Sequence, residues 1–376
     1  MTADRRTRIL IVDDSAVMRS LLRSVVAADP CLEVAGTAAD GQAVLNSVEV
    51  LRPDLILLDV EMPVMDGLVT LRELRRRGHK MPVVMCSSLT QRGAKVTIEA
   101  LACGASDYVA KPAGQSGREE AIHALTQDLI PKIHTLAGQA RKQPMPVLPG
   151  AARPPLAFHM ANSTPLPAPS LPAVLAIGVS TGGPAALDIL LPALPASFPL
   201  PVLIVQHMPE LFTSLLAERL NGRCAVRVRE AAEGDPVRAG TMYIARGNWH
   251  MEVLAASHAG APPTLHLHQG PLENHCRPAV DVLFRSAARA YGAGVLAVVL
   301  TGMGSDGLSG CRMIRERGGA VLTQDQASST VWGMPGAVAH AGLAYKVLPL
   351  DAMASEILRI AGAARHEARE PRRWVV

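Results

Sequence analysis

Aromatic side chains are scarce in this chain, at 3% of the residues, so alanine, valine, leucine and isoleucine must fill its cores. Cysteine is also rare: the six cysteines are scattered without C-x-x-C spacing, and no signal-peptide pattern precedes the first apolar segment. These two absences favour a reduced, cytoplasmic protein. No uninterrupted apolar run approaches the roughly 18 residues that a membrane-spanning helix needs. Insertion into a membrane is therefore not expected.

A strong excess of charge is missing too, since the formal net charge is +4 and the basic residues are dispersed. Short basic runs occur at residues 75–77 and 372–373. Without interleaved aromatic residues or a helix-turn-helix pattern, these runs do not indicate binding to nucleic acid. A mildly basic surface is instead compatible with an acidic protein partner.

The first third of the chain alternates short apolar segments with amphipathic helical stretches, a pattern typical of a doubly wound α/β domain. Five strands, each followed by a helix, fit a flavodoxin-like order. The strands are predicted at residues 8–12, 32–38, 55–58, 82–86 and 107–109.

A proline-rich segment divides the chain, with nine prolines between residues 143 and 172. Proline fixes φ and donates no backbone hydrogen bond, so this segment is predicted to be a semi-rigid linker in the polyproline II conformation. The predicted parts are a first domain at 1–136, the linker at 137–171, a second α/β domain at 172–364 and a basic tail at 365–376.

Three carboxylates follow predicted strands of the first domain: Asp13 and Asp14 after one strand and Asp59 after another. The carboxyl ends of parallel strands share one edge of a sheet, so we expect these like charges to meet there around a hard divalent cation, most simply Mg²⁺. Ser87 and Lys111 follow two further strands and could hold the oxygens of a phosphoryl group on Asp59. Taken singly, each aspartate could instead be a helix cap or a turn residue.

The second domain repeats this arrangement with a serine, a histidine and an aspartate. Ser180 lies in a G-x-S-x-G sequence, the elbow that lets a serine occupy a sharp strand-to-helix turn. We predict Ser180 as the nucleophile, His207 as the general base and Asp306 as the residue that orients the imidazole. Each follows a short apolar segment predicted to be a buried parallel strand, at residues 174–177, 202–205 and 295–300.

The chain order Ser180, His207, Asp306 differs from that of the α/β-hydrolases, which argues against that fold and leaves the chemistry open. The backbone N–H groups of Thr181 and Met303 are the candidate donors to an oxyanion.

Other interpretations of these motifs remain. The glycines at 178, 182 and 183 could belong to a dinucleotide-binding loop, although Ser180 stands where that fingerprint needs glycine. His266 and His268 could bind a metal, but alternation more simply places both on the exposed face of a strand. Cys224 and Cys276 lack a paired histidine with a matching elbow, so they are interpreted as incidental thiols.

The first domain closely resembles response-regulator receiver domains over about residues 7–130. The matching segments are 11–15, 58–67, 87–88 and 111–112. The resemblance implies that Asp59 accepts a phosphoryl group from a histidine kinase, with Asp13 and Asp14 holding Mg²⁺ beside it.

The whole chain outside the linker and tail resembles the chemotaxis protein-glutamate methylesterase family, CheB. The matching segments of the second domain are 177–184, 206–209 with 212–213, 277–284, 300–307 and 332–335. The resemblance implies a flavodoxin-like receiver joined to a Rossmann-like methylesterase domain. It also implies that Ser180, His207 and Asp306 form the catalytic triad, and that the ester reaction needs no cofactor.

For partners, the resemblance implies chemoreceptors whose glutamate methyl esters are hydrolysed and whose particular glutamines are deamidated. It further implies a histidine kinase of the CheA type, activation by phosphorylation and a monomeric state. Three alternatives stay open: a receiver-controlled hydrolase of another protein ester or amide, a silent binding module, and a regulator that acts on DNA. The last lacks an output helix-turn-helix.

Overall fold

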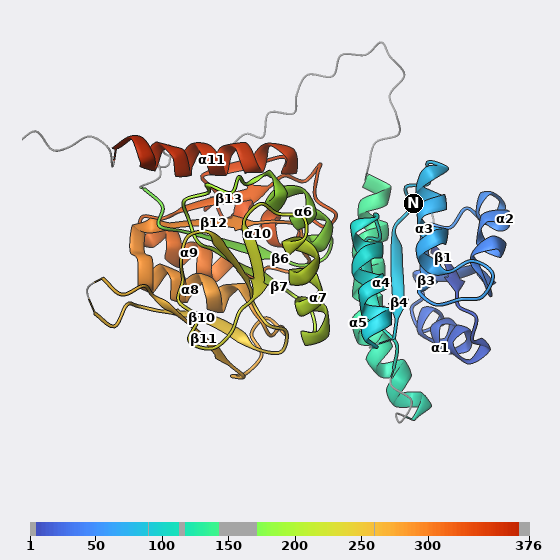
Figure 1. Cartoon of the computed structure of the whole chain (residues 1–376). Helices are drawn as coiled ribbons and strands as arrows, with labels where there is room; N and C mark the ends of the chain where they lie inside the picture. The colour runs from blue at the N-terminus through green and yellow to red at the C-terminus, as the bar shows by residue number, and fades with distance from the viewer. Residues whose placement is uncertain (1–4, 89, 113–116, 143–170, 259, 368–376) are drawn as a thin grey trace, which may run out of the picture. The chain divides into compact units, whose positions relative to one another are not determined.

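A computed structural model describes residues 5–88, 90–112, 117–142, 171–258 and 260–367. The chain forms two compact units that divide between Pro167 and Ala168 (Figure 1). This division lies inside the predicted linker, most of which is outside the described residues. Each unit is an α/β structure built on a parallel sheet, which confirms the predicted fold class.

The sheet of the first unit has the order β2-β1-β3-β4-β5, and all its strands are parallel. Its central strands are buried along their whole length because helices cover both faces. The strands are β1 (Thr7–Val12), β2 (Leu32–Ala38), β3 (Leu55–Asp59), β4 (Val83–Ser87) and β5 (Asp107–Ala110). The helices are α1 (Ala16–Ala27), α2 (Gly41–Leu51), α3 (Gly67–Arg76), α4 (Gln91–Ala102) and α5 (Arg118–Lys142).

Helix α5 extends beyond the predicted end of the first domain. It continues six residues past the boundary expected at 136, to Lys142. Its apolar residues Leu129, Ile133 and Leu136 recur at helical spacing and are all buried, so the packing continues through Pro131. The helix therefore includes the first six residues that were assigned to the linker and ends just before the proline-rich segment.

The second unit has a seven-stranded parallel sheet with the order β14-β13-β12-β6-β7-β9-β8. Its strands are β6 (Val174–Val179), β7 (Val202–Gln206), β8 (Arg227–Glu230), β9 (Thr241–Ile244), β12 (Val295–Val299), β13 (Ala320–Gln324) and β14 (Lys346–Leu348). The α-helices are α6 (Gly183–Leu190), α7 (Glu210–Asn221), α8 (Val280–Tyr291), α9 (Leu308–Glu316), α10 (Met334–His340) and α11 (Leu350–Glu367). Short 3₁₀ helices occupy Leu191–Ala193 and Gly292–Gly294.

A separate antiparallel pair, β10 (His250–Leu254) and β11 (Thr264–His268), lies against α8. The fold prediction had only parallel sheets in this unit and did not include the pair. Leu265 and Leu267 of β11 are buried, while His266 and His268, which alternate with them, are half-buried on the other face.

The topology brings three strand ends to one edge of the second sheet. Strand β6 lies between β12 and β7, with Gly178 opposite Val299 and Val179 opposite Gln206. The loops that leave these strands therefore start beside one another.

None of the described helices combines the length and the apolar composition that crossing a bilayer requires.

Candidate active site and carboxylate cluster

Ser180 is the first residue after β6 and is fixed by three backbone contacts. Its N–H donates to the carbonyl of Thr301 at 3.0 Å, and its carbonyl accepts from the N–H of Gly183 at 2.8 Å. The same carbonyl accepts from Nε2 of Gln206 at 3.0 Å. The side-chain oxygen has no hydrogen bond within the described parts of the chain, and it lies just ahead of the N-terminus of α6, where the helix dipole favours negative charge.

Glycine at 302 allows the loop after β12 to approach the serine. A Cβ atom at Gly302 would lie 2.8 Å from Cβ of Ser180 and 2.4 Å from Sδ of Met334. Gly182, with φ of 77°, makes the turn between Ser180 and α6 in a conformation that disfavours other residues. The glycines of the two motifs therefore serve close packing around the serine.

A buried glutamine that the sequence analysis did not select links the serine to the histidine. The side chain of Gln206 donates from Nε2 to the carbonyl oxygens of both Ser180 and His207, at 3.0 and 3.2 Å. A glutamine at the end of an otherwise apolar strand, just before His207, was the signal that could have identified it.

His207 and Asp306 form the predicted pair. Nε2 of His207 lies 2.7 Å from Oδ2 of Asp306, and the two side chains are 12% and 3% exposed. The imidazole therefore donates to a buried carboxylate through one nitrogen, which leaves Nδ1 as the nitrogen that can exchange a proton with a substrate or nucleophile.

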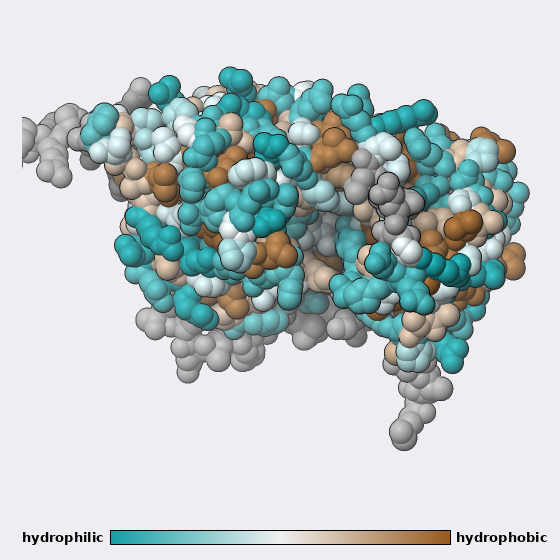
Figure 2. Space-filling view, turned by 90° about the horizontal axis from the view of Figure 1, so that it is seen from below, coloured by the Kyte–Doolittle hydropathy of each residue, from teal (hydrophilic) through white to brown (hydrophobic). Residues whose placement is uncertain are grey.

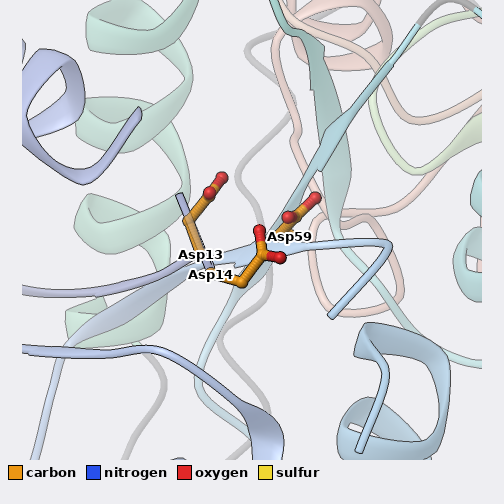
Figure 3. A group of neighbouring side chains, drawn as sticks. All are labelled: Asp13, Asp14 and Asp59. Carbon is orange, nitrogen blue, oxygen red and sulfur yellow. The ribbon is translucent and has the colours of Figure 1, made fainter. Parts of the chain in front are cut away.

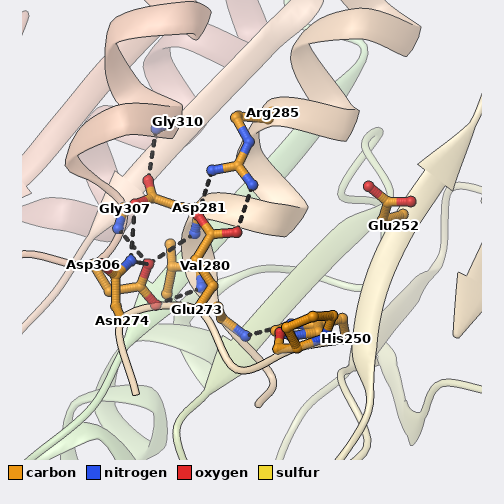
Figure 4. A network of polar contacts seen from close by, with 12 residues as sticks. His250, Glu252, Glu273, Asn274, Val280, Asp281, Arg285, Asp306, Gly307 and Gly310 are labelled. Atoms are coloured by element: carbon orange, nitrogen blue, oxygen red, sulfur yellow. Dashed lines mark hydrogen bonds and ion pairs between the residues drawn. The ribbon is translucent and has the colours of Figure 1, made fainter. Parts of the chain in front are cut away.

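The carboxylate of Asp306 accepts hydrogen bonds from five N–H donors. Figure 4 shows Asp306 beside Asn274, Val280, Asp281 and Gly307. Helix α8 begins here, so the carboxylate lies at the positive end of its dipole. Besides His207, the donors are the backbone N–H groups of Val280, Asp281 and Gly307 and the side chain of Asn274. Although burial raises the pKa of Asp306, the hydrogen bond and charge of His207 and these backbone donors outweigh it and lower the pKa below its ordinary value.

The thiol of Cys276 corrects an expectation. Cys276 was interpreted as having no paired histidine, yet it lies against the imidazole of His207. Burial by itself lowers the pKa of His207, but the hydrogen bonds to Asp306 and Cys276 outweigh it and raise the pKa to about 9. Cys224, by contrast, has a pKa raised by burial to about 11, in keeping with an unreactive thiol.

The candidate oxyanion donors lie next to the serine. Thr181 follows Ser180 directly and is buried, and Met303 follows Gly302, whose close approach to Ser180 is described above. Both residues make further contacts, so their assignment as oxyanion donors stays a prediction.

In the first unit, the three predicted aspartates lie together at the sheet edge (Figure 3). One oxygen of each of Asp13, Asp14 and Asp59 lies within 4.8 Å of the others. Lys111 lies between two of them, with Nζ 2.8 Å from Asp13 and 2.7 Å from Asp59. Oδ2 of Asp13 is buried and has no hydrogen-bond partner within the described residues beyond this ion pair. An oxygen-only set of this kind fits a hard divalent cation.

Burial raises the pKa of Asp59, and the nearby Asp13 adds to this, although Lys111 acts in the opposite direction. Negative charge is thus concentrated at the three carboxylates, and a bound cation would neutralise it. Ser87 ends the neighbouring strand β4, where it donates to the carbonyl of Ser88 and accepts from Thr97. Its contact with a phosphoryl group stays a prediction.

His266 and His268 do not converge on the predicted active site. Nδ1 of His266 lies 3.1 Å from Glu233, and Nε2 of His268 lies 3.8 Å from Glu252. Within the described ranges, the aspartate trio of the first unit is the group whose ligand atoms are close enough to share an ion.

Comparison with known proteins gives matches for both units. The response regulator receiver domain matches residues 9–123, and the CheB methylesterase matches residues 175–357. A protein-glutamate methylesterase/protein-glutamine glutaminase of Trichodesmium erythraeum is 48% identical over 94% of this chain and 99% of its own length. One from Nocardioides sp. is 50% identical over 94% of each chain. The crystal structure of the Thermotoga maritima CheB methylesterase catalytic domain is 38% identical, with a TM-score of 0.48, over 50% of this chain and 98% of its own.

The fold and the site thus define a response regulator whose second domain is a hydrolytic enzyme. The chain belongs to the family of protein-glutamate methylesterases/protein-glutamine glutaminases, the CheB family. This confirms the resemblance that the sequence motifs indicated.

Proposed function

We propose that this chain hydrolyses glutamate methyl esters on chemoreceptors, and deamidates particular receptor glutamines, through Ser180, His207 and Asp306. The observation that carries the proposal is the buried pair of His207 and Asp306 at the sheet edge where Ser180 begins its turn. The names of the relatives support the substrate class and disfavour a hydrolase of some other ester or amide.

The proposed reaction has two steps. The oxygen of Ser180 attacks the ester carbonyl, His207 takes the serine proton, and the proton passes to the methoxy group, which leaves as methanol. Water then attacks the acyl-serine with the same base, releasing the glutamate side chain and restoring the serine. The N–H groups of Thr181 and Met303 would stabilise the oxyanion of each tetrahedral intermediate. With a glutamine substrate, ammonia leaves in place of methanol.

Release of methanol from methylated chemoreceptor membranes tests the proposal directly. The wild-type chain should release methanol in proportion to enzyme, and membranes without methylated receptor should give none. Absence of release from methylated receptors would reject the proposed substrate.

We infer that the first unit regulates this reaction through Asp59, which would accept a phosphoryl group from a histidine kinase of the CheA type. Asp13, Asp14 and Asp59 would hold Mg²⁺, which supplies positive charge to neutralise the phosphoryl oxygens. Lys111 already contacts Asp59 and would contact the phosphoryl group together with Ser87.

Replacing Asp59 with asparagine should leave basal methanol release unchanged and abolish its increase by a small-molecule phosphodonor. Asparagine keeps the size of the side chain but cannot form the acyl phosphate. The measurement is the initial rate with and without the phosphodonor and Mg²⁺. Asp54→Asn, in the loop before β3, is the matched control and should respond like the wild type. An increase that persists in Asp59→Asn would reject Asp59 as the acceptor.

The raised pKa of His207 predicts the pH dependence of the unphosphorylated enzyme. Only neutral imidazole can accept the serine proton, so kcat/KM should rise with pH up to about 9 and then level off. Methanol release measured from about pH 6 to about pH 10 gives the profile. Cys276→Ala removes one of the contacts that raise this pKa and should move the rise to lower pH. A profile that is flat above neutral pH would contradict the assignment.

We further propose that the chain acts as a monomer in the cytoplasm. The proposed functional parts are the receiver at 1–136, the linker at 137–171, the methylesterase domain at 172–364 and the basic tail at 365–376, with α5 and α11 extending past two of these limits.

A further inference from the structure

A tight turn from Glu273 to Cys276 contacts the proposed catalytic pair from outside the three sequence motifs. The turn is closed by two backbone hydrogen bonds, from Glu273 to Cys276 at 3.1 Å and in reverse at 2.9 Å. Its two central residues, Asn274 and His275, have φ of 51° and 62°. Positive φ at both positions is the geometry of a type I′ turn, in which asparagine is favoured.

The turn is fastened to the rest of the unit at several points. The carboxylate of Glu273 accepts two hydrogen bonds from Arg285 of α8, at 2.5 and 2.6 Å (Figure 4). The fully buried imidazole of His250 donates to the carbonyl of Pro271 and accepts from the N–H of Ala279, so it holds both ends of the segment. The position of Asn274 is therefore set by the scaffold.

The side chain of Asn274 lies between two buried carboxylates. Its Nδ2 donates to Oδ1 of Asp306 at 2.8 Å and to Oδ2 of Asp281 at 3.0 Å. Asp281 otherwise accepts from the N–H of Gly310 at 2.6 Å. Because both carboxylates accept from one nitrogen, they lie close enough to repel each other, and burial together with the charge of Asp306 raises the pKa of Asp281. One neutral amide thus serves both without adding charge.

We propose that Asn274 is a positioning residue for the reaction, whose carboxamide orients the Asp306 carboxylate toward His207 and sets the proton affinity of that histidine. The role rests on the proposed function, since it acts through Asp306. A cation at this place would neutralise the carboxylate and weaken its hold on the imidazolium; a neutral donor orients the carboxylate and leaves its charge in place.

Among the described residues, few charged or titratable groups face the pair of His207 and Asp306. A change in proton binding by His207 can therefore be traced to Asn274. Cys276 faces His207 from the same turn, and Asp281 faces Asp306 from α8. The ion pair of Glu273 and Arg285 lies further out and also acts on Asp306.

The test uses Asn274→Gly, because glycine keeps the positive φ while removing the carboxamide. The control is His275→Gly, which makes the same backbone change at the adjacent turn position, where the side chain is exposed. The readout is the titration of the His207 imidazole by NMR in the full-length chain labelled with ¹⁵N-histidine, with His207→Gln identifying the resonance.

Loss of the amide removes an N–H donor that partly offsets the negative charge of Asp306. The carboxylate should then stabilise the imidazolium more strongly, so His207 in Asn274→Gly should bind its proton roughly threefold more tightly than in the wild type. His275→Gly should titrate like the wild type. In parallel, kcat for methanol release should fall roughly tenfold to a hundredfold in Asn274→Gly, with KM little changed.

Coincident titration curves for folded Asn274→Gly and wild type would overturn the proposal, because a turn residue that serves only folding would not change the imidazole. The NMR titration needs no substrate. If wild type releases no methanol, the proposed function fails while the histidine titration still decides the role of Asn274. Asn274→Asp, which keeps the size of the side chain but adds negative charge, should raise the proton affinity at least as much as glycine does.

Discussion

Replacing Ser180 with alanine is expected to reduce methanol release from methylated chemoreceptors by a factor of about 10⁴ to 10⁶. The serine oxygen would form the acyl intermediate, so alanine at this position removes the nucleophile. The backbone around it should be unchanged, since the contacts that fix Ser180 are made by its N–H and carbonyl groups. The measurement is the rate of methanol release under saturating phosphodonor.

Two comparisons make this result specific. Ser305→Ala changes an exposed serine of the loop that carries Asp306, and it should leave the rate near that of the wild type. The double variant Ser180→Ala/His207→Ala should retain about the same residual activity as Ser180→Ala, because residues that act as a unit do not lose rate additively. A further large loss in the double variant would mean that His207 acts independently of the serine.

The parts that were predicted from the sequence are those set by local pattern and by the geometry of parallel sheets. Asp13, Asp59, Ser180 and His207 each stand at or directly after a buried strand, and neighbouring parallel strands end at the same edge. The order of strands then brings the side chains together without any information on side-chain contacts.

The parts that were not predicted depend on contacts between distant segments. Asn274 and Cys276 lie on a turn whose position is set by Arg285 and His250, and nothing in the turn's own sequence specifies those partners. The antiparallel partner of β11 was missed for the same reason, since the alternation of residues 264–268 predicts a strand but not what it pairs with.

The donor pattern around Asp306 leads to the second large effect. Replacing Asp306 with asparagine is expected to lower kcat for methanol release by roughly 10⁴-fold. Oδ1 accepts from three N–H groups and Oδ2 accepts from Val280 and His207, so both oxygens must be acceptors. An asparagine amide would place an NH₂ group against N–H donors in either orientation, which would displace His207 or force the wrong tautomer.

The pH profile separates this effect from a loss of folding. Asp306 raises the pKa of His207, so removing its charge should lower that pKa and move the rise of kcat/KM to lower pH, while the maximum stays far below that of the wild type. Asp188→Asn, which breaks a carboxylate's ion pairs with Arg219 and Arg223 on the same unit, is the control for stability and should keep its kcat.

Because the pKa of Asp306 is lowered in the folded chain, its contribution to stability is present above the ordinary aspartate pKa and is lost on acidification. Asp306→Asn should therefore melt at a lower temperature than the wild type at neutral pH, and the difference should shrink as the pH falls below about 4. A variant that kept its rate would show that the imidazole needs no carboxylate partner, and the proposed triad would be wrong.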